Sequence, residues 1–110
     1  MKKLRLFLLL LLLIPLSNRA QDPLIKRANQ EYDAFSFKPA QDIYKRVLEK
    51  GYVSAEILQK LGDTHYFNAE YDKAAEVYGR LVAEYPHDAG PAYYFRYAQA
   101  LKSREDYAGA

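Results

Sequence analysis

An all-α fold built of antiparallel helix pairs is predicted by three features of the chain. The sequence resembles itself at a fixed separation, so that residues 24–48 align with residues 58–82. Apolar residues in both copies recur at spacings of three and four, which is the pattern of one face of an α-helix. No stretch alternates between apolar and polar residues for long enough to indicate a strand. A repeat of about 34 residues is typical of proteins that stack one structural unit on the next.

The two copies keep the size and polarity of their residues. The aligned pairs include Leu24 and Leu58, Ala28 and Gly62, Tyr32 and Tyr66, Phe37 and Tyr71, Ala40 and Ala74, Tyr44 and Tyr78, Arg46 and Arg80, and Val47 and Leu81. A third copy begins at a slightly larger separation, which aligns Leu58 with Tyr94. Its matching residues are Tyr94, Tyr97, Ala98, Leu101, Tyr107 and Ala110. We therefore predict a repeat domain over residues 21–110, with complete repeats at 21–54 and 55–88 and a partial third at 91–110.

Residues 1–20 are predicted to be a secretory signal peptide. Lys2, Lys3 and Arg5 form a basic start, residues 6–14 are an unbroken apolar run, and residues 15–20 are a polar exit ending in Ala20. The apolar run is far shorter than the roughly 20 residues that span a membrane. We expect cleavage after Ala20, and the lack of cysteine favours a bacterial periplasm over a disulfide-forming extracellular setting.

Net charge argues against a nucleic-acid partner. The formal charge of +2 includes four basic residues of the signal peptide, and no acidic residue lies there. The remaining chain has 12 basic and 14 acidic residues, a net charge of −2. A nucleic-acid-binding domain would need a basic stripe of its own.

The first pair of helices is predicted from its apolar stripes and its end signals. Asp22 and Pro23 suit the start of a helix over residues 24–35, with Leu24, Ala28, Tyr32 and Phe35 on one face. The second helix has Pro39 in its first turn and ends at Gly51. Its apolar stripe comprises Ala40, Ile43, Tyr44, Val47 and Leu48.

The second pair follows the same plan. Ser54 is the expected N-cap of a third helix, residues 68–70 form a turn, and Pro86 ends the fourth helix. Residues 88–91 form the next connection, and a fifth helix is predicted from about Ala92 to Ser103. The beginning of a sixth helix is expected before Ala110, so Tyr94, Tyr97 and Leu101 should expose apolar surface that its remainder would cover.

We predict no catalytic residues, no metal site and no cofactor. Without cysteine, thiolate catalysis and thiolate metal ligation are excluded. His65 is expected to be a packing residue and His87 a solvated loop residue. The chain contains no glycine-rich phosphate loop. Five tyrosines are expected in the core: Tyr44, Tyr71, Tyr78, Tyr94 and Tyr97.

The repeat resembles the tetratricopeptide repeat, a helix–turn–helix unit of about 34 residues. The best copy is residues 55–88, where Leu58, Leu61, Gly62, Tyr66, Tyr71, Ala74, Tyr78, Leu81 and Pro86 match the large, small and helix-ending positions of that family. The resemblance implies a helical-hairpin solenoid.

A narrower resemblance is to the amino-terminal region of Bacteroidota OmpA-family envelope proteins. It is carried by the signal peptide, by residues 61–69 and by residues 94–103. It implies an exported protein of the periplasm or outer membrane. It also implies that peptidoglycan would be bound only through domains that this chain does not contain.

In tetratricopeptide repeats the first helix of each pair lines a concave groove. The resemblance therefore implies a partner-binding surface that includes Asn29, Tyr32, Asp33, Gln59, Asp63, Tyr66, Phe67, Phe95 and Gln99, flanked by Ile25 and Lys102. Gln59 and Asp63 stand where a clamp for a peptide carboxylate would need cations or amides. We thus expect a neutral or basic peptide with apolar anchors.

Protein interaction is the leading hypothesis and a structural role is the alternative, although the groove itself favours neither. The chain is either a non-enzymatic protein-interaction module of the envelope or a rigid spacer within a larger assembly. An enzyme, with its catalytic domain elsewhere, is the least favoured hypothesis. No small-molecule substrate is expected.

Overall fold

The computed structural model describes residues 22–108, and the predicted signal peptide lies outside them. The five helices of the described part are α2 (Pro23–Asp33), α3 (Phe37–Glu49), α4 (Ala55–Phe67), α5 (Tyr71–Glu84) and α6 (Pro86–Ala108). No strand occurs between residues 22 and 108. The all-α class is therefore confirmed.

Local end signals fix most of the helix boundaries. The Asp22 side chain accepts a hydrogen bond from the Leu24 amide at 2.8 Å, and the Ser54 hydroxyl accepts one from the Ile57 amide at 3.1 Å. Gly51 follows the end of α3 with a φ of +92°, a conformation that glycine adopts without strain. All three end signals were expected from the sequence.

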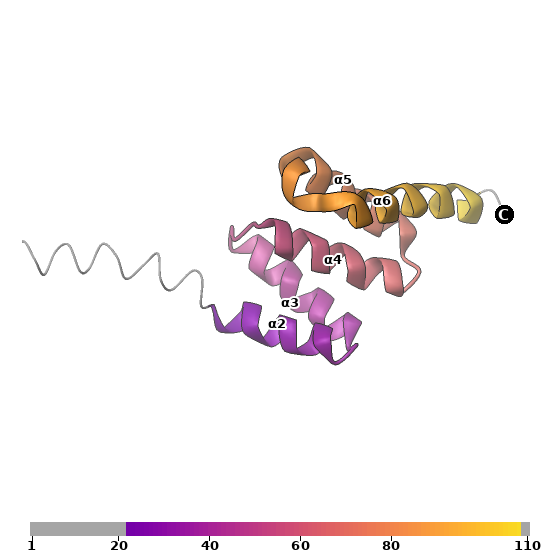
Figure 1. Cartoon of the computed structure of the whole chain (residues 1–110). Coiled ribbons are helices and arrows are strands. Elements are labelled where there is room, and N and C mark those ends of the chain that lie inside the picture. Colours follow the sequence, from indigo (N-terminus) through magenta and orange to yellow (C-terminus); the bar gives the residue numbers. More distant parts are fainter. Residues whose placement is uncertain (1–21, 109–110) are drawn as a thin grey trace, which may run out of the picture.

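Each helix packs against the next helix along the chain, and α4 also contacts α6. Figure 1 shows the result: α2 and α3 form one end of the stack, α4 lies in the middle, and α5 and α6 form the other end. Short turns at residues 34–36 and 68–70 reverse the chain direction within the two pairs. The described residues thus form consecutive helical hairpins.

The core runs through the stack in two adjoining clusters. One is centred on Tyr44 and Val47 between α2, α3 and α4, and the other on Tyr78 and Leu81 between α4, α5 and α6. A side chain at Gly62 would meet the Tyr78 ring, since an added Cβ would overlap it. This glycine therefore permits the close approach of α4 and α5.

Two boundaries differ from the sequence prediction. The first helix ends at Asp33, and Phe35 lies in the turn with a φ of +60° instead of on the apolar helix face. Gly90, with a φ of +76°, breaks α6 within the predicted connection at 88–91, and the helix that follows it continues past the predicted end at Ser103 to Ala108 without a turn. His87 is exposed as expected but lies in a helix and not in a loop. The expected start of a sixth helix is instead a continuation of α6.

Candidate partner-binding surface

Asp63, in the middle of α4, joins four side chains from three other helices. Its Oδ1 accepts hydrogen bonds from the Tyr78 hydroxyl at 2.6 Å and from Nη1 of Arg96 at 2.8 Å. Its Oδ2 accepts from the hydroxyls of Tyr32 at 2.7 Å and Tyr93 at 2.9 Å. These donors come from α2, α5 and α6.

This environment makes Asp63 a structural residue. It is fully buried, and all four of its partners donate to it. Burial raises the pKa of Tyr78 and Tyr93 well above the usual range for tyrosine, and the neighbouring carboxylate raises it further, so both hydroxyls keep their protons. The expectation that Asp63 offers an accessible carboxylate to a partner is therefore wrong, because its lone pairs are already occupied.

The same contact pattern occurs one repeat earlier. Asn29 accepts hydrogen bonds from the Tyr44 hydroxyl at 2.6 Å and from Nζ of Lys60 at 3.1 Å. Thus an acceptor on the first helix of a pair bonds a tyrosine of the second helix and a cation of the following helix. Asn29, like Asp63, has an internal role.

A row of aromatic rings, two of them exposed and three half-buried, lies at the ends of the first two pairs. We call it the aromatic edge and define it as Tyr32, Phe35, Phe37, Tyr66 and Phe67. Ring centroids are 6.0 Å apart for Phe35 and Phe37, and 5.1 Å apart for Phe37 and Phe67. The ring centroids of Tyr32 and Phe37 are 5.7 Å apart, and those of Tyr66 and Phe67 are 5.8 Å apart. These spacings are those of edge-to-face and tilted aromatic pairs.

Arg96 extends the aromatic edge toward α6. Its guanidinium lies 5.5 Å from the Phe67 ring centroid and 5.2 Å from that of Tyr93. Because the same guanidinium donates to Asp63, its charge is largely compensated. The aromatic edge thus presents flat, apolar ring faces, and the Arg96–Asp63 pair beside it adds little net charge.

Phe35 stands out within the aromatic edge. Its side chain is 80% exposed, and its backbone has the left-handed φ of +60° that bulky residues rarely adopt. Ala69 holds the same conformation at the matching position of the second copy, with a φ of +58°. The turn itself therefore does not require an aromatic residue at this position.

The structure separates the remaining predicted groove residues. Phe67 is half exposed within the aromatic edge, Asp33 is exposed at the end of α2, and Gln59 donates to the Asp88 carbonyl at 3.0 Å. Phe95 is 63% exposed on α6 and Gln99 is half-buried, but the α6 residues that reach Asp63 are Tyr93 and Arg96. Ile25 packs against the first core cluster, and Lys102 is exposed.

Four residues of this region were not among the predicted site residues. They are Phe35 and Phe37 of the aromatic edge, and Tyr93 and Arg96, which donate to Asp63. A signal for one of them was present, since the alignment of the third copy places Arg96 on Lys60 and both are cations. Tyr94 occupies a repeat-core position but is 45% exposed, as expected for a face that the remainder of a sixth helix would cover, while its neighbour Tyr93 faces α4.

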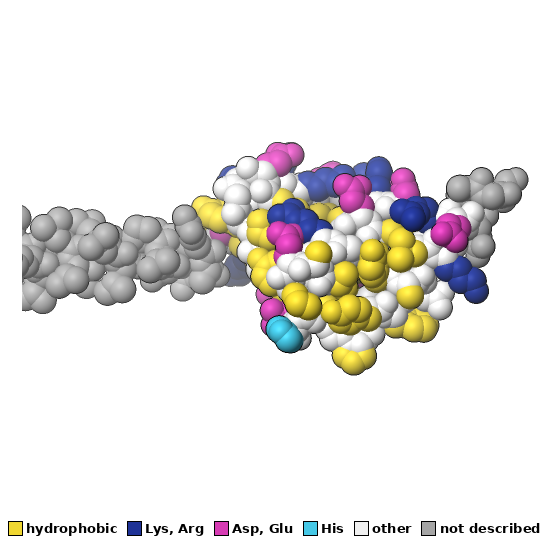
Figure 2. Space-filling model, turned by 90° about the horizontal axis from the view of Figure 1, so that it is seen from above, with side chains coloured by type: hydrophobic (Ala, Val, Ile, Leu, Met, Phe, Trp, Pro, Cys, Tyr) yellow, Lys and Arg dark blue, Asp and Glu magenta, His cyan; other side chains and the backbone are white. Residues whose placement is uncertain are grey.

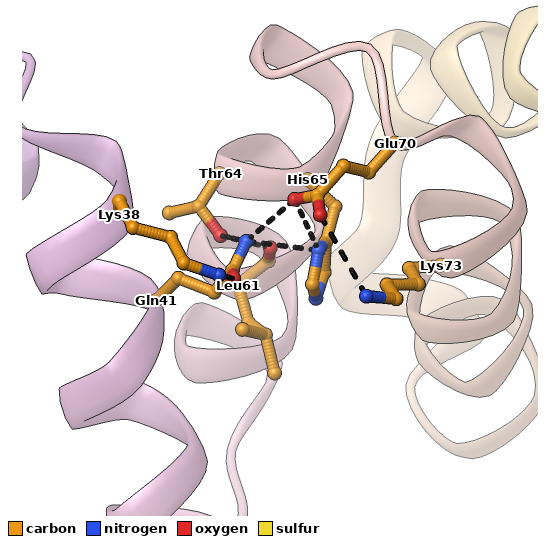
Figure 3. Close-up of polar contacts among 7 residues, drawn as sticks. All are labelled: Lys38, Gln41, Leu61, Thr64, His65, Glu70 and Lys73. Atoms are coloured by element: carbon orange, nitrogen blue, oxygen red, sulfur yellow. Dashed lines mark hydrogen bonds and ion pairs between the residues drawn. The ribbon is translucent and has the colours of Figure 1, made fainter.

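A second polar cluster links α3 to the end of α4 (Figure 3). Nε2 of the buried Gln41 lies 2.9 Å from Nδ1 of His65 and 3.0 Å from Oε1 of Glu70. Burial lowers the pKa of His65, so its ring is neutral near neutral pH, and the same Nδ1 lies 3.1 Å from Oε1 of Glu70. Nδ1 accepts from the Gln41 amide in one tautomer and donates to Glu70 in the other. The pKa of Glu70 is lowered to about 2, chiefly by the hydrogen bond from Gln41. His65 is thus buried as expected, with hydrogen bonds in addition to packing.

Between residues 22 and 108, no three His, Cys, Asp or Glu side chains are grouped so as to hold a metal ion. None of the helices in this range has the length and apolar character needed to cross a membrane.

Comparisons of the chain with family models, with curated proteins and with solved structures found no match.

Proposed function

We propose that this chain is a non-enzymatic protein-interaction module with a tetratricopeptide-type arrangement of helical hairpins. The contacts that recur with the sequence repeat support this arrangement. Tyr44 bonds Asn29 as Tyr78 bonds Asp63, and the repeat aligns the members of one pair with those of the other. Such stacking creates extended surfaces suited to binding other proteins.

The observation that carries the proposal is Phe35. A left-handed backbone costs roughly 1–2 kcal/mol for a residue with a side chain. The mostly exposed Phe35 ring recovers little of this through burial, and Ala69 forms the same turn without an aromatic ring. Strained backbone positions are frequent at functional sites, and large aromatic side chains are frequent anchors of protein interfaces.

The aromatic edge suits an extended peptide segment with apolar or aromatic side chains. Phe35 and Phe67 provide exposed ring surface, and Phe37 packs between them. Large aromatic side chains are frequent anchors of binding energy in protein interfaces. The preference for a basic peptide loses its main support, because Arg96 already neutralises Asp63.

The test compares Phe35→Gly with Ala69→Gly. Both variants place glycine at a left-handed position, and only the first removes an aromatic ring. We expect the immobilised wild-type and Ala69→Gly chains to retain the same envelope proteins, and the Phe35→Gly chain to lose them while remaining folded by circular dichroism. Equal retention by all three chains would favour the rigid-spacer function instead.

For localisation, we propose export to the periplasm or the outer membrane as part of an OmpA-like envelope protein. The basic start, the apolar run of residues 6–14 and Ala20 support this proposal. Cell fractionation and amino-terminal sequencing of the exported chain should find it in the envelope, beginning at Gln21. Recovery of the chain from the cytoplasm with Met1 still at its amino terminus would contradict the proposal.

A further inference from the structure

The outward face of α6 is apolar. Tyr94 is 45% exposed, Ala98 is exposed and Leu101 is half-buried. Figure 2, which views the molecule from the α5–α6 end of the stack, shows hydrophobic side chains gathered between charged ones on this face. This surface is separate from the aromatic edge, so an inference about it does not depend on the peptide site proposed above.

The contacts within the stack identify the equivalent residues of α4 and α6. Lys60 of α4 reaches back to Asn29 of α2 at 3.1 Å, and Arg96 of α6 reaches back to Asp63 of α4 at 2.8 Å. Each pair joins the first helix of one hairpin to the helix two elements later. Lys60 and Arg96 are therefore equivalent, and α6 corresponds to α4 in the alignment of the third copy.

This equivalence shows which α6 residues another helix would cover. Tyr94, Ala98 and Leu101 correspond to Leu58, Gly62 and His65, which are buried in α4. In α4 the close contact at Gly62 is made by Tyr78 of α5. No helix of the described range 22–108 occupies the corresponding place beside α6.

Gln99 gives this face a hydrogen-bond acceptor that a docked helix would have to satisfy. It corresponds to Asp63 and, one repeat earlier, to Asn29, and it is half-buried. Asn29 accepts a hydrogen bond from Tyr44, and Asp63 accepts one from Tyr78. The amide oxygen of Gln99 is thus the third acceptor of the series and fits a tyrosine hydroxyl.

The two helices that fill this place within the stack share one pattern. It consists of alanine, tyrosine four residues later and an aliphatic residue three residues after that. The residues are Ala40, Tyr44 and Val47 in α3, and Ala74, Tyr78 and Leu81 in α5, and all six are buried. We propose that an amphipathic helix of a partner protein with this pattern docks antiparallel to α6, with its tyrosine donating to Gln99.

A second copy of the chain fits this place poorly. Its α3 and α5 helices carry the pattern, but Tyr44 and Tyr78 are fully buried in its own core. Its α2 helix presents Pro23, Arg27 and Gln30 at the positions of Ile57, Leu61 and Thr64, and all three are exposed. That end of the stack is therefore too polar to cover the apolar face of α6.

A peptide with the sequence of residues 70–85 can serve as the probe, because it contains the α5 pattern. A staple between positions 72 and 76, both exposed in α5, would hold it helical without altering the docking face. We expect the labelled peptide to bind the full chain in fluorescence anisotropy. Binding should weaken at least tenfold for the Ala98→Glu chain and remain unchanged for the Phe35→Gly chain, which alters the other surface.

The hydroxyl contact has its own control. A probe carrying Tyr78→Phe, with its other two tyrosines kept, should bind the wild-type chain about fivefold more weakly, as expected for one neutral hydrogen bond. With the Gln99→Leu chain the two probes should bind equally. Absence of binding, or equal binding to the wild-type and Ala98→Glu chains, would overturn the proposal. A wild-type dimer that Ala98→Glu converts to a monomer would assign the face to a second copy instead.

Discussion

Replacing Asp63 by asparagine should lower the free energy of unfolding by about 2–4 kcal/mol. The substitution keeps the shape of the side chain and removes its charge. Asparagine keeps one acceptor oxygen for Tyr78 and Arg96, but its NH2 group replaces the oxygen that accepts from Tyr32 and Tyr93. Each of the four bonds is therefore weakened or lost, at roughly 0.5–1 kcal/mol apiece. Arg96 also loses its counter-charge, but this guanidinium is about one-third exposed, so solvent limits that loss to less than about 1 kcal/mol.

Urea unfolding followed by circular dichroism measures this effect. For a domain of this size, a loss of about 2–4 kcal/mol should move the midpoint down by roughly 1.5–3 M. Glu56→Gln is the matched control, because it also neutralises a carboxylate on α4. Its carboxylate is 61% exposed, so its pair with Lys60 contributes about 0.5 kcal/mol or less. Equal midpoints for Asp63→Asn and Glu56→Gln would refute the role assigned to the Asp63 contacts.

Three further predictions concern the rest of the stack. Gly62→Ala should destabilise the domain by about 1–3 kcal/mol, measured in the same urea assay, because the added carbon meets the Tyr78 ring; an unchanged midpoint would mean that the ring can move aside. Ala69→Gly should stabilise it by about 0.5–1 kcal/mol by relieving the positive φ, and a lower melting temperature would contradict this. The free energy of unfolding should fall below about pH 6.5, because the pKa of His65 is lower in the folded than in the unfolded chain, so the unfolded chain binds the proton more readily. It should fall again below about pH 4.5, because the pKa of Glu70 is about 2 in the folded chain and the unfolded chain again takes up the proton first. Unfolding midpoints measured from pH 8 to pH 3 test both steps, and His65→Gln should abolish only the first.

The helix pairs were predictable because their signals are local. Asp22, Ser54 and Gly51 act within a few residues of their own positions, and the apolar spacings repeat within each helix. Phe35 misled the prediction because it continues the helical spacing from Tyr32. The helix had already ended at Asp33, and spacing alone does not reveal a left-handed residue.

The polar interior was not predictable in the same way. Asp63 lies on a helix position that resemblance places in a groove, and its four partners lie 15 to 33 residues away in the sequence. Each partner is individually an ordinary tyrosine or arginine. Only the packing of α2, α5 and α6 around α4 brings their donors to one carboxylate.

The position of Asp63 has a mechanical consequence for the whole stack. Arrays of helical hairpins bend easily, because each unit contacts only its neighbours. Here one oxygen, Oδ2, is shared by Tyr32 from the first hairpin and Tyr93 from α6. Bending that opens this side of the array must stretch the Tyr32 bond where α2 moves from α4, and the Tyr93 bond where α6 moves from α4. The domain should therefore behave as a stiff arm, and a load applied at α2 would be transmitted through α4 to α6.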